Sequence, residues 1–441
     1  MSQDHPGYRG KALETVKKAG AEVGDLIRVR KDQKAYEGIL IPRSEYDDEE
    51  HVVIKIDSGY NIGIRISPTT EIEKIGPGAK PTFKPPPPPK QKPDLPQVAI
   101  ISTGGTIASR VDYRTGAVRP ALSARDLYSV VPELSEIARI DARILFSLYS
   151  ENIAPEHWTE TAKAVAKEID HGAAGVVVAH GTDTLAYTAA ALSFALQELP
   201  VPVILVGSQR SADRPSSDAA TNLIGAVRTA AQAPFAEVAV AMHETISDQP
   251  IALHRGTKVR KCHTSRRDTF KSINTPLLAS LEDQKITMLV PDYEPRDTNR
   301  ELVLEPDFID EAGLIKFHPG LNPKLIEWYI DNDYRGMILE GTGLGHVGRY
   351  CFSAIRKAIA NDTVVAMTSQ CIQGRIDMNV YDQGRDLLAM GVLPLEDMLP
   401  ETALVKLMWI LGQTKDTEEA KRLLTTNLAH EISPRTLPEE G

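Results

Sequence analysis

Two short stretches of this sequence place glycines and hydroxyl side chains directly after apolar runs. The first reads Thr-Gly-Gly-Thr at 103–106 and follows the stretch 98–102, which suits a short buried strand. The second reads His-Gly-Thr-Asp-Thr at 180–184 and follows the run 175–179. Glycines let a backbone turn sharply, and open α/β sheets bind ligands at the carboxyl ends of their strands. A threonine in such a loop could serve as a nucleophile, although each loop taken alone also fits a tight turn with capping side chains.

The segments from residue 98 onward alternate between apolar runs and helical periodicity. Because strands separated by helices pair in parallel, this alternation predicts an α/β fold with doubly wound parallel sheets. In its first half we expect strands at 98–102, 175–179, 201–206, 238–242 and 286–290, and helices at 156–169 and 185–199. In its second half we expect strands at 314–317, 336–339 and 364–369, and helices at 324–330, 353–360, 402–411 and 417–424.

The residues before this region have a different pattern. A helix is predicted at 10–19, and apolar residues then alternate with polar ones in short runs between 24 and 75. This alternation, broken by acidic and glycine turns, predicts a small antiparallel β-barrel-like module, which is either a docking unit or a structural appendage. Residues 76–97 are rich in proline and lysine, which favours an extended polyproline II linker.

The composition limits the class of protein. The chain has 441 residues, a net charge of −10, 42% hydrophobic and 25% charged residues, which is typical of a globular protein and argues against nonspecific nucleic-acid binding by its whole surface. No apolar run is long enough to span a bilayer, and the first residues lack the regions of a signal peptide, so we expect a cytoplasmic protein without membrane association. Three widely spaced cysteines predict thiols rather than a disulfide framework or a zinc site.

A Gly-x-Gly-x-x-Gly pattern at 343–348 needs its own interpretation. A dinucleotide site would require an acidic residue near the end of the next strand, but that strand ends in Ser-Gln-Cys at 369–371. We therefore interpret the pattern as a glycine-rich structural or subunit-contact loop. The sequence has no Walker A motif and no His-x-x-x-His spacing, so no metal or nucleotide site is predicted on this chain.

The two loops together resemble the signature motifs of the bacterial-type L-asparaginase/glutaminase family. The likeness continues at 150–152, 206–210, 218–223 and 269–272, and it covers residues 98 to about 425. It implies the two-domain α/β fold of that family, with domains at 98–290 and 311–441 joined by a connection at 291–310. It also implies an amidase that works as a dimer or larger assembly, with its sites at subunit contacts.

The resemblance assigns catalytic roles to four residues. Thr106 would attack the side-chain amide carbon of the substrate, which forms an acyl-enzyme and ammonia, and water would then release the acid. Thr182, Asp183 and Lys261 would form a second relay in which Lys261 acts as a base toward Thr182. Backbone N–H groups of the glycine turns are natural oxyanion donors.

The resemblance also implies substrate-binding residues. Ser150 would hold the substrate together with Asp183, and Glu151 stands where the family has a glutamine. Tyr113, on the loop 110–116, would take the role of a lid tyrosine. Lys258 and Arg260 lie close enough in sequence to Lys261 to be alternatives for the catalytic cation.

The residues before 98 indicate which family of asparaginase-like proteins this chain resembles. A helix and β module at 1–75 and a linker at 76–97, followed by an asparaginase-like region, resemble the GatD family of the archaeal glutamyl-tRNA(Gln) amidotransferases, as do the loop 109–117 and Glu-Ile-Ser at 431–433. That resemblance implies that the chain releases ammonia from glutamine, or asparagine, for a GatE partner. The partner would use ATP and Mg²⁺ to convert Glu-tRNA(Gln) to Gln-tRNA(Gln). It further implies a homodimer core within a heterotetramer, and no cofactor on this chain.

Two other functions remain open from the sequence. The chain could be a stand-alone asparaginase with an accessory N-terminal domain, which would turn over free asparagine without a partner. It could also be a binding scaffold without catalytic activity. Ammonia release, measured with and without a partner, separates these hypotheses.

Overall fold

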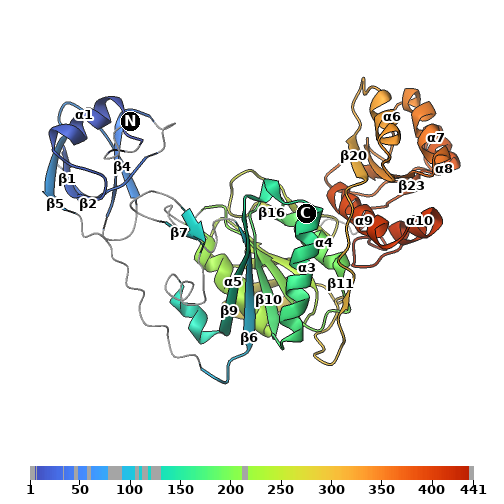
Figure 1. The fold of residues 1–441 in the computed structure, drawn as a ribbon, viewed down its shortest axis with the longest axis horizontal. Coiled ribbons are helices and arrows are strands. Elements are labelled where there is room, and N and C mark those ends of the chain that lie inside the picture. The colour runs from blue at the N-terminus through green and yellow to red at the C-terminus, as the bar shows by residue number, and fades with distance from the viewer. Residues whose placement is uncertain are drawn as a thin grey trace.

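The computed structural model shows three successive folded units along the chain (Figure 1). It describes residues 5, 7–32, 34–43, 48–56, 61–77, 92–104, 109–111, 118–120, 131–210 and 217–436. The predicted linker at 76–97 therefore lies mostly outside the described residues. Within the described part of the chain, no helix is long and apolar enough to cross a membrane.

The N-terminal unit is one helix packed on an antiparallel sheet, which confirms the predicted antiparallel module. The sheet has the order β4-β3-β2-β1-β5. Its core includes Ala12 and Val16 of the helix and the alternate residues Ile27 and Val29 of the first strand, all fully buried. The elements are α1 (Gly10–Lys18), β1 (Leu26–Lys31), β2 (Lys34–Leu40), β3 (His51–Lys55), β4 (Asn61–Arg65) and β5 (Glu71–Gly76).

The central unit is built on an eight-stranded sheet of order β18-β17-β14-β13-β12-β10-β6-β9. The five strands from β13 to β9 are parallel, whereas β14, β17 and β18 extend the sheet antiparallel. The strand expected at 286–290 is thus antiparallel, although we expected it among the parallel strands. The strands are β6 (Gln97–Gly104), β9 (Arg139–Leu148), β10 (Gly175–Ala179), β12 (Val203–Val206), β13 (Val238–His243), β14 (Ile251–Arg255), β17 (Ala279–Glu282) and β18 (Lys285–Met288).

Helices cover both faces of this sheet. Val98 and Ile100 of β6 pack in one cluster with α5 (Ala219–Gln232), whereas Ala99 and Ile101 pack in another with α3 (Pro155–Asp170) and α4 (Leu185–Ala195). Successive side chains of a strand point to opposite faces, so a strand covered on both sides is apolar on both, as residues 98–101 of β6 are. Helix α4 is shorter than expected because Leu196–Gln197 forms a short strand, β11, paired with β19 (Val303–Leu304).

The C-terminal unit is a four-stranded parallel sheet of order β20-β21-β22-β23. It shares a core with the central unit, because Phe194 of α4 stacks on Trp409 of α9 with ring centroids 5.9 Å apart. The two α/β units confirm the asparaginase-like fold class. The elements are β20 (Ala312–Lys316), α6 (Lys324–Asp331), β21 (Gly336–Gly341), α7 (Phe352–Ala360), β22 (Val364–Ser369), α8 (Asp382–Met390), β23 (Leu393–Pro394), α9 (Pro400–Gln413) and α10 (Thr417–Thr425).

Short elements complete the described chain. A two-stranded ribbon, β15 with β16, follows β14 in sequence and carries residues of the site discussed below. The remaining bounds are β7 (Ser109–Val111), β8 (Val118–Pro120), β15 (Val259–Lys261), β16 (Phe270–Ser272), η1 (Pro132–Glu136), η2 (Ser150–Asn152) and η3 (Arg349–Cys351).

Candidate active site

Thr103 and Gly104, the described residues of the first loop, lie at the carboxyl end of β6, and the second loop follows β10, which pairs with β6. Thr103 is buried, and its hydroxyl donates a hydrogen bond of 3.1 Å to the carbonyl of Ala179, which joins the two strand ends. Gly104 has a φ of +128°, and a Cβ there would lie 2.0 Å from the carbonyl oxygen of Leu148. Thr106 and Tyr113 lie outside the described residues.

The second loop is fixed by His180, whose imidazole is completely buried. Its Nδ1 lies 2.7 Å from the carbonyl oxygen of Gly181, so Nδ1 must carry the proton. Its Nε2 then accepts from the Thr188 hydroxyl at 2.9 Å, and that hydroxyl accepts from the indole N–H of Trp158 at 3.1 Å. Burial lowers the pKa of His180 to about 4 from its usual 6.5, so the ring stays neutral and its two ring nitrogens hold the loop.

This buried imidazole predicts a loss of stability in acid. The unfolded chain binds a proton at His180 below about pH 6.5, whereas the folded chain does so only near pH 4. We expect the free energy of unfolding to decrease as the pH is lowered through this window. The contribution of this residue is at most about 1.4 kcal/mol per pH unit. Buried His254, with a pKa of about 3, acts in the same direction. Denaturant titrations between pH 7.5 and pH 4.5 would measure the slope, which His180→Asn should reduce; an unchanged slope would contradict the assignment.

Three of the predicted catalytic side chains are in direct contact. The Lys261 Nζ donates to the Thr182 hydroxyl at 2.9 Å and to Asp183 Oδ1 at 2.7 Å. The side chain of Lys261 is 15% exposed and that of Asp183 is 68% exposed, so the cluster sits at the boundary between protein and solvent. Residues almost eighty positions apart in sequence thus form one acid-base cluster at the second glycine loop.

The structure also separates Lys261 from its two alternatives. Lys258 is buried and pairs with Asp397 at 2.7 Å. The Arg260 side chain pairs with Glu401 at 3.3 Å. Among these three cations it is therefore Lys261 that contacts Thr182.

Ser150 lies against the same loop, at the start of η2. Its carbonyl accepts a 2.6 Å hydrogen bond from the Thr184 hydroxyl. A Cβ at Gly181 would lie 2.9 Å from the Ser150 hydroxyl oxygen, so only glycine permits this close approach. Ser150 is buried and the adjacent Glu151 is exposed, which leaves Glu151 accessible to a ligand at the edge of the site.

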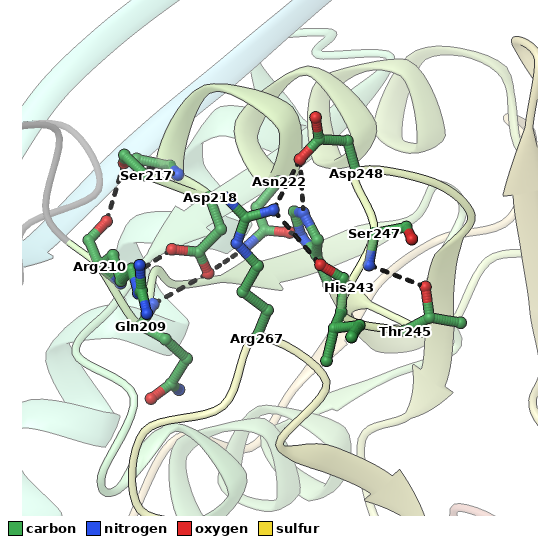
Figure 2. Close-up of polar contacts among 12 residues, drawn as sticks. Gln209, Arg210, Ser217, Asp218, Asn222, His243, Thr245, Ser247, Asp248 and Arg267 are labelled. Carbon is green, nitrogen blue, oxygen red and sulfur yellow. Dashed lines mark hydrogen bonds and ion pairs between the residues drawn. The ribbon is translucent and has the colours of Figure 1, made fainter. Parts of the chain in front are cut away.

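A third loop, residues 207–210 after β12, is bonded to polar side chains at the start of α5 (Figure 2). Buried Asp218 accepts from the backbone N–H groups of Gln209 and Arg210 at 2.9 and 2.8 Å. Asn222, one helical turn further along α5, donates to Asp218 and to the carbonyl of Gly207, and its oxygen lies 2.5 Å from His243 Nδ1. The loop is therefore held by buried polar side chains.

The third loop touches the acid-base cluster through Gly207. A Cβ at Gly207 would lie 2.7 Å from Thr182 Cγ2, so this glycine allows Thr182 to pack against the loop. The sequence indicated the segment 218–223 as part of the family likeness but gave it no role. The spacing of Asp218 and Asn222 at i and i+4, which places both on one helix face, was the available signal.

The Gly-x-Gly-x-x-Gly loop follows β21 and is a packed turn. Gly343 and Gly345 have φ values of +51° and +98°. A Cβ at Gly345 would lie 3.1 Å from both Met367 and Met378. This geometry fits the structural interpretation of the pattern. Among the residues that the structure describes, no group of three or more His, Cys, Asp or Glu side chains is placed to hold a metal ion.

Three protein-family models match successive parts of this chain. The family model "Asparaginase, N-terminal" matches residues 97–292, and "Glutaminase/Asparaginase C-terminal domain" matches residues 312–424. The family model "GatD N-terminal domain" matches residues 21–75. The first match covers the central unit with the site residues described above, the second covers the C-terminal unit, and the third covers the N-terminal unit.

Curated relatives match over the full length. The GatD subunit of the Metallosphaera sedula glutamyl-tRNA(Gln) amidotransferase is 50% identical over 97% of both chains. The chain belongs to the GatD family of glutamyl-tRNA(Gln) amidotransferase subunits. The GatD proteins of Methanothermobacter thermautotrophicus and Pyrococcus furiosus are also 50% identical, over 97% and 96% of this chain and 98% of each relative.

The two α/β units of this GatD family member are similar to solved structures of L-asparaginases. The thermostable L-asparaginase from Thermococcus kodakarensis has a TM-score of 0.69 and 35% identity, and it covers 77% of this chain and all of its own. L-asparaginase I from Vibrio cholerae has a TM-score of 0.68 and 28% identity, over 77% of this chain and 99% of its own. The asparaginase type of fold is thus joined here to a further N-terminal unit.

Proposed function

We propose that this chain is the glutaminase subunit of a tRNA-dependent amidotransferase that converts Glu-tRNA(Gln) to Gln-tRNA(Gln). The contact of Lys261 with both Thr182 and Asp183 carries the amidase part of this proposal. The full-length likeness to GatD relatives, which includes the N-terminal unit, supports the tRNA-dependent part.

The proposed reaction begins with Thr106. Its hydroxyl oxygen attacks the side-chain amide carbon of glutamine, its proton passes to the leaving amide nitrogen, and ammonia departs as the acyl-enzyme forms. Water then adds to the ester, and glutamate leaves as the Thr106 hydroxyl is restored. Backbone N–H groups of the glycine turns would stabilise the oxyanion of each tetrahedral intermediate.

The proton transfers of this reaction would be made by Thr182, Lys261 and Asp183. The Lys261 Nζ lies 2.9 Å from the Thr182 hydroxyl oxygen, close enough for a proton to pass between them, and in the proposed relay Lys261 acts as the base toward Thr182. Asp183 holds the amine in place through Oδ1. Its exposed carboxylate, together with Ser150 and Glu151, would bind the α-amino and α-carboxyl groups of the substrate, and Tyr113 would close over it.

The proposed partner is an ATP-using subunit, GatE, that receives the ammonia. This partner would use ATP and Mg²⁺ to activate the glutamyl group of Glu-tRNA(Gln), so this chain itself would need no cofactor. We propose a homodimer of this chain at the core of a heterotetramer. The names of the relatives, each of which is one subunit of an amidotransferase, support a multi-subunit assembly.

Ammonia release from glutamine and asparagine tests the proposal. We expect slow release by the purified chain alone and faster release with the partner subunit and Glu-tRNA(Gln). Full turnover of free asparagine by the chain alone would instead favour a stand-alone asparaginase, a function that the L-asparaginase neighbours support. A chain that releases no ammonia under any of these conditions would be a binding scaffold.

A further inference from the structure

The strand that carries Lys261 has little support from its own sheet. Among the described strands, β15 pairs only with β16, in a two-stranded ribbon of three residues a side. A two-stranded ribbon is at best marginally stable by itself, so its position must come from other contacts. The direction of the Lys261 side chain depends on those contacts.

The C-terminal unit contacts the start of β15 through a buried ion pair. The Lys258 Nζ, directly before β15, donates to Asp397 Oδ2 at 2.7 Å and lies 3.3 Å from the Asp397 carbonyl. The two side chains are 1% and 2% exposed. Asp397 lies between β23 and α9, so the pair joins the two units at full burial.

Further bonds hold the same stretch from the same side. The Arg260 guanidinium pairs with Glu401 of α9. The Thr402 hydroxyl donates to the carbonyl of Thr257 at 2.9 Å, and the Asn274 amide donates to the carbonyl of Asp397 at 3.0 Å. Each bond links the β15–β16 region to the C-terminal unit.

The segment 428–433 packs against this ion pair. The Ser433 N–H donates to Asp397 Oδ1 at 2.9 Å, and the Ala429 carbonyl accepts from the Thr257 hydroxyl at 2.9 Å. Glu431 shapes this segment, because it accepts from the Ala429 N–H and pairs with fully buried Lys406 at 2.5 Å. The segment 428–433 therefore keeps the Lys258–Asp397 pair away from water.

The alternation of a strand explains the effect on Lys261. In β15 the side chain at 260 points to one face and those at 259 and 261 point to the other, while Lys258, directly before the strand, pairs with the C-terminal unit as Arg260 does. Pinning Lys258 and Arg260 to the C-terminal unit therefore turns Lys261 toward Thr182 and Asp183, while Val259 enters the core of the central unit. A small rotation of the ribbon would separate the Lys261 amine from both partners.

We propose that Lys258 and Asp397 are positioning residues that fix Lys261 from the C-terminal unit through their buried ion pair. For its consequence on activity, this inference rests on the proposed amidase function. The activity of the central unit would then depend on the ion pair that joins it to the C-terminal unit.

The accessibility of the Lys261 amine tests the inference without using activity. Full-length wild type and Asp397→Asn are treated briefly with an N-hydroxysuccinimide ester, and modification of each lysine is followed by peptide mass spectrometry. We expect Lys261 to be modified several-fold faster in Asp397→Asn. The matched control is Glu237→Gln, which breaks another buried pair, Arg255–Glu237, at the amino end of β13. It should leave the modification rate of Lys261 unchanged.

Kinetics provide the second readout. If the chain is an amidase, kcat for ammonia release should fall by about 10- to 100-fold in Asp397→Asn, with a smaller change in KM, because the reacting groups and not the substrate are displaced. Glu237→Gln should lower stability and leave kcat near that of wild type. Glu401→Gln provides a milder test if Asp397→Asn does not fold, since its partner Arg260 is partly exposed.

The outcomes separate this inference from the proposed function. Unchanged Lys261 modification in folded Asp397→Asn and Glu401→Gln would overturn the positioning role, whatever the activity of wild type. Faster modification in these variants would support it, even if wild type released no ammonia and the amidase proposal failed.

Discussion

Lys261→Met is expected to lower kcat for ammonia release by roughly 10²–10⁴-fold, the usual contribution of a positioned acid-base group. The Lys261 amine lies within hydrogen-bond distance of Thr182 and Asp183, and methionine keeps the length of the side chain without the amine. The folded state should lose no more than about 1 kcal/mol, because Asp183 remains solvated when its partner is removed. A coupled ammonia assay and a thermal melt measure the two effects.

Lys271→Met is the matched control for this prediction. Lys271 lies on the neighbouring strand β16, opposite Arg260, and its exposed amine is 3.4 Å from Asp268. Its replacement should leave kcat within about twofold of wild type, as is usual for a surface substitution. If Lys261→Met retained full activity, or if both variants lost activity equally, Lys261 would not be the base of the relay.

A double variant shows whether Thr182 and Lys261 act as one unit. Thr182→Val replaces the hydroxyl with a methyl group of similar size and should itself lower kcat strongly. Groups that act in one relay are not additive, so the variant with both substitutions should be little slower than the slower single variant. Multiplication of the two effects would indicate independent roles.

The sequence predicted the elements whose signal lies in their own residues. Gly175–Ala179 and the first four residues of Val364–Ser369 are apolar because both faces are covered, and both strands have the expected bounds. Helix α3 begins at Pro155, directly before the expected start at 156, because proline fits the first turn of a helix. The two loops that follow parallel strands were identified for the same local reason.

The elements that were missed have mixed or weak local signals. Strand β9 (Arg139–Leu148) lies at the edge of its sheet and alternates charged with apolar residues, so its pattern resembles an exposed segment. The direction of β18 depends on its pairing with β17 and not on its own residues. Helix α5 was noticed only as a family-like segment.

The site residues that belong to a sequence motif were predictable. Those whose position depends on an ion pair between the two α/β units were not. Thr182 and Asp183 were identifiable from their loop, whereas the choice of Lys261 over Lys258 depended on a resemblance. The structure distinguishes them by burial, since Lys258 pairs with a carboxylate 139 positions away. No spacing rule could reveal such a partner, because the approach of Asp397 depends on how the two α/β units pack.

Gly104→Ala is expected to disable the site and destabilise the protein by at least about 3 kcal/mol, the scale of a substitution that combines backbone strain with overpacking. An added Cβ would lie 2.0 Å from the Leu148 carbonyl oxygen and 2.7 Å from its nitrogen, and the φ of +128° is itself unfavourable for alanine. Relief of the clash would move the end of β6 away from β9, and the Thr-Gly-Gly-Thr loop starts at that end. Denaturant unfolding and the ammonia assay should both show the loss.

Gly172→Ala separates the two causes. Gly172 has a φ of +84°, and no atom lies within 4 Å of the position that a Cβ would take there, so alanine introduces backbone strain without a clash. We expect this variant to lose about 1 kcal/mol of stability and no activity. Equal losses in the two variants would mean that the backbone conformation alone requires glycine at 104. A much larger loss in Gly104→Ala would mean that β9 sets the path of the loop, since it is the Leu148 backbone that leaves no room for a side chain where β6 ends.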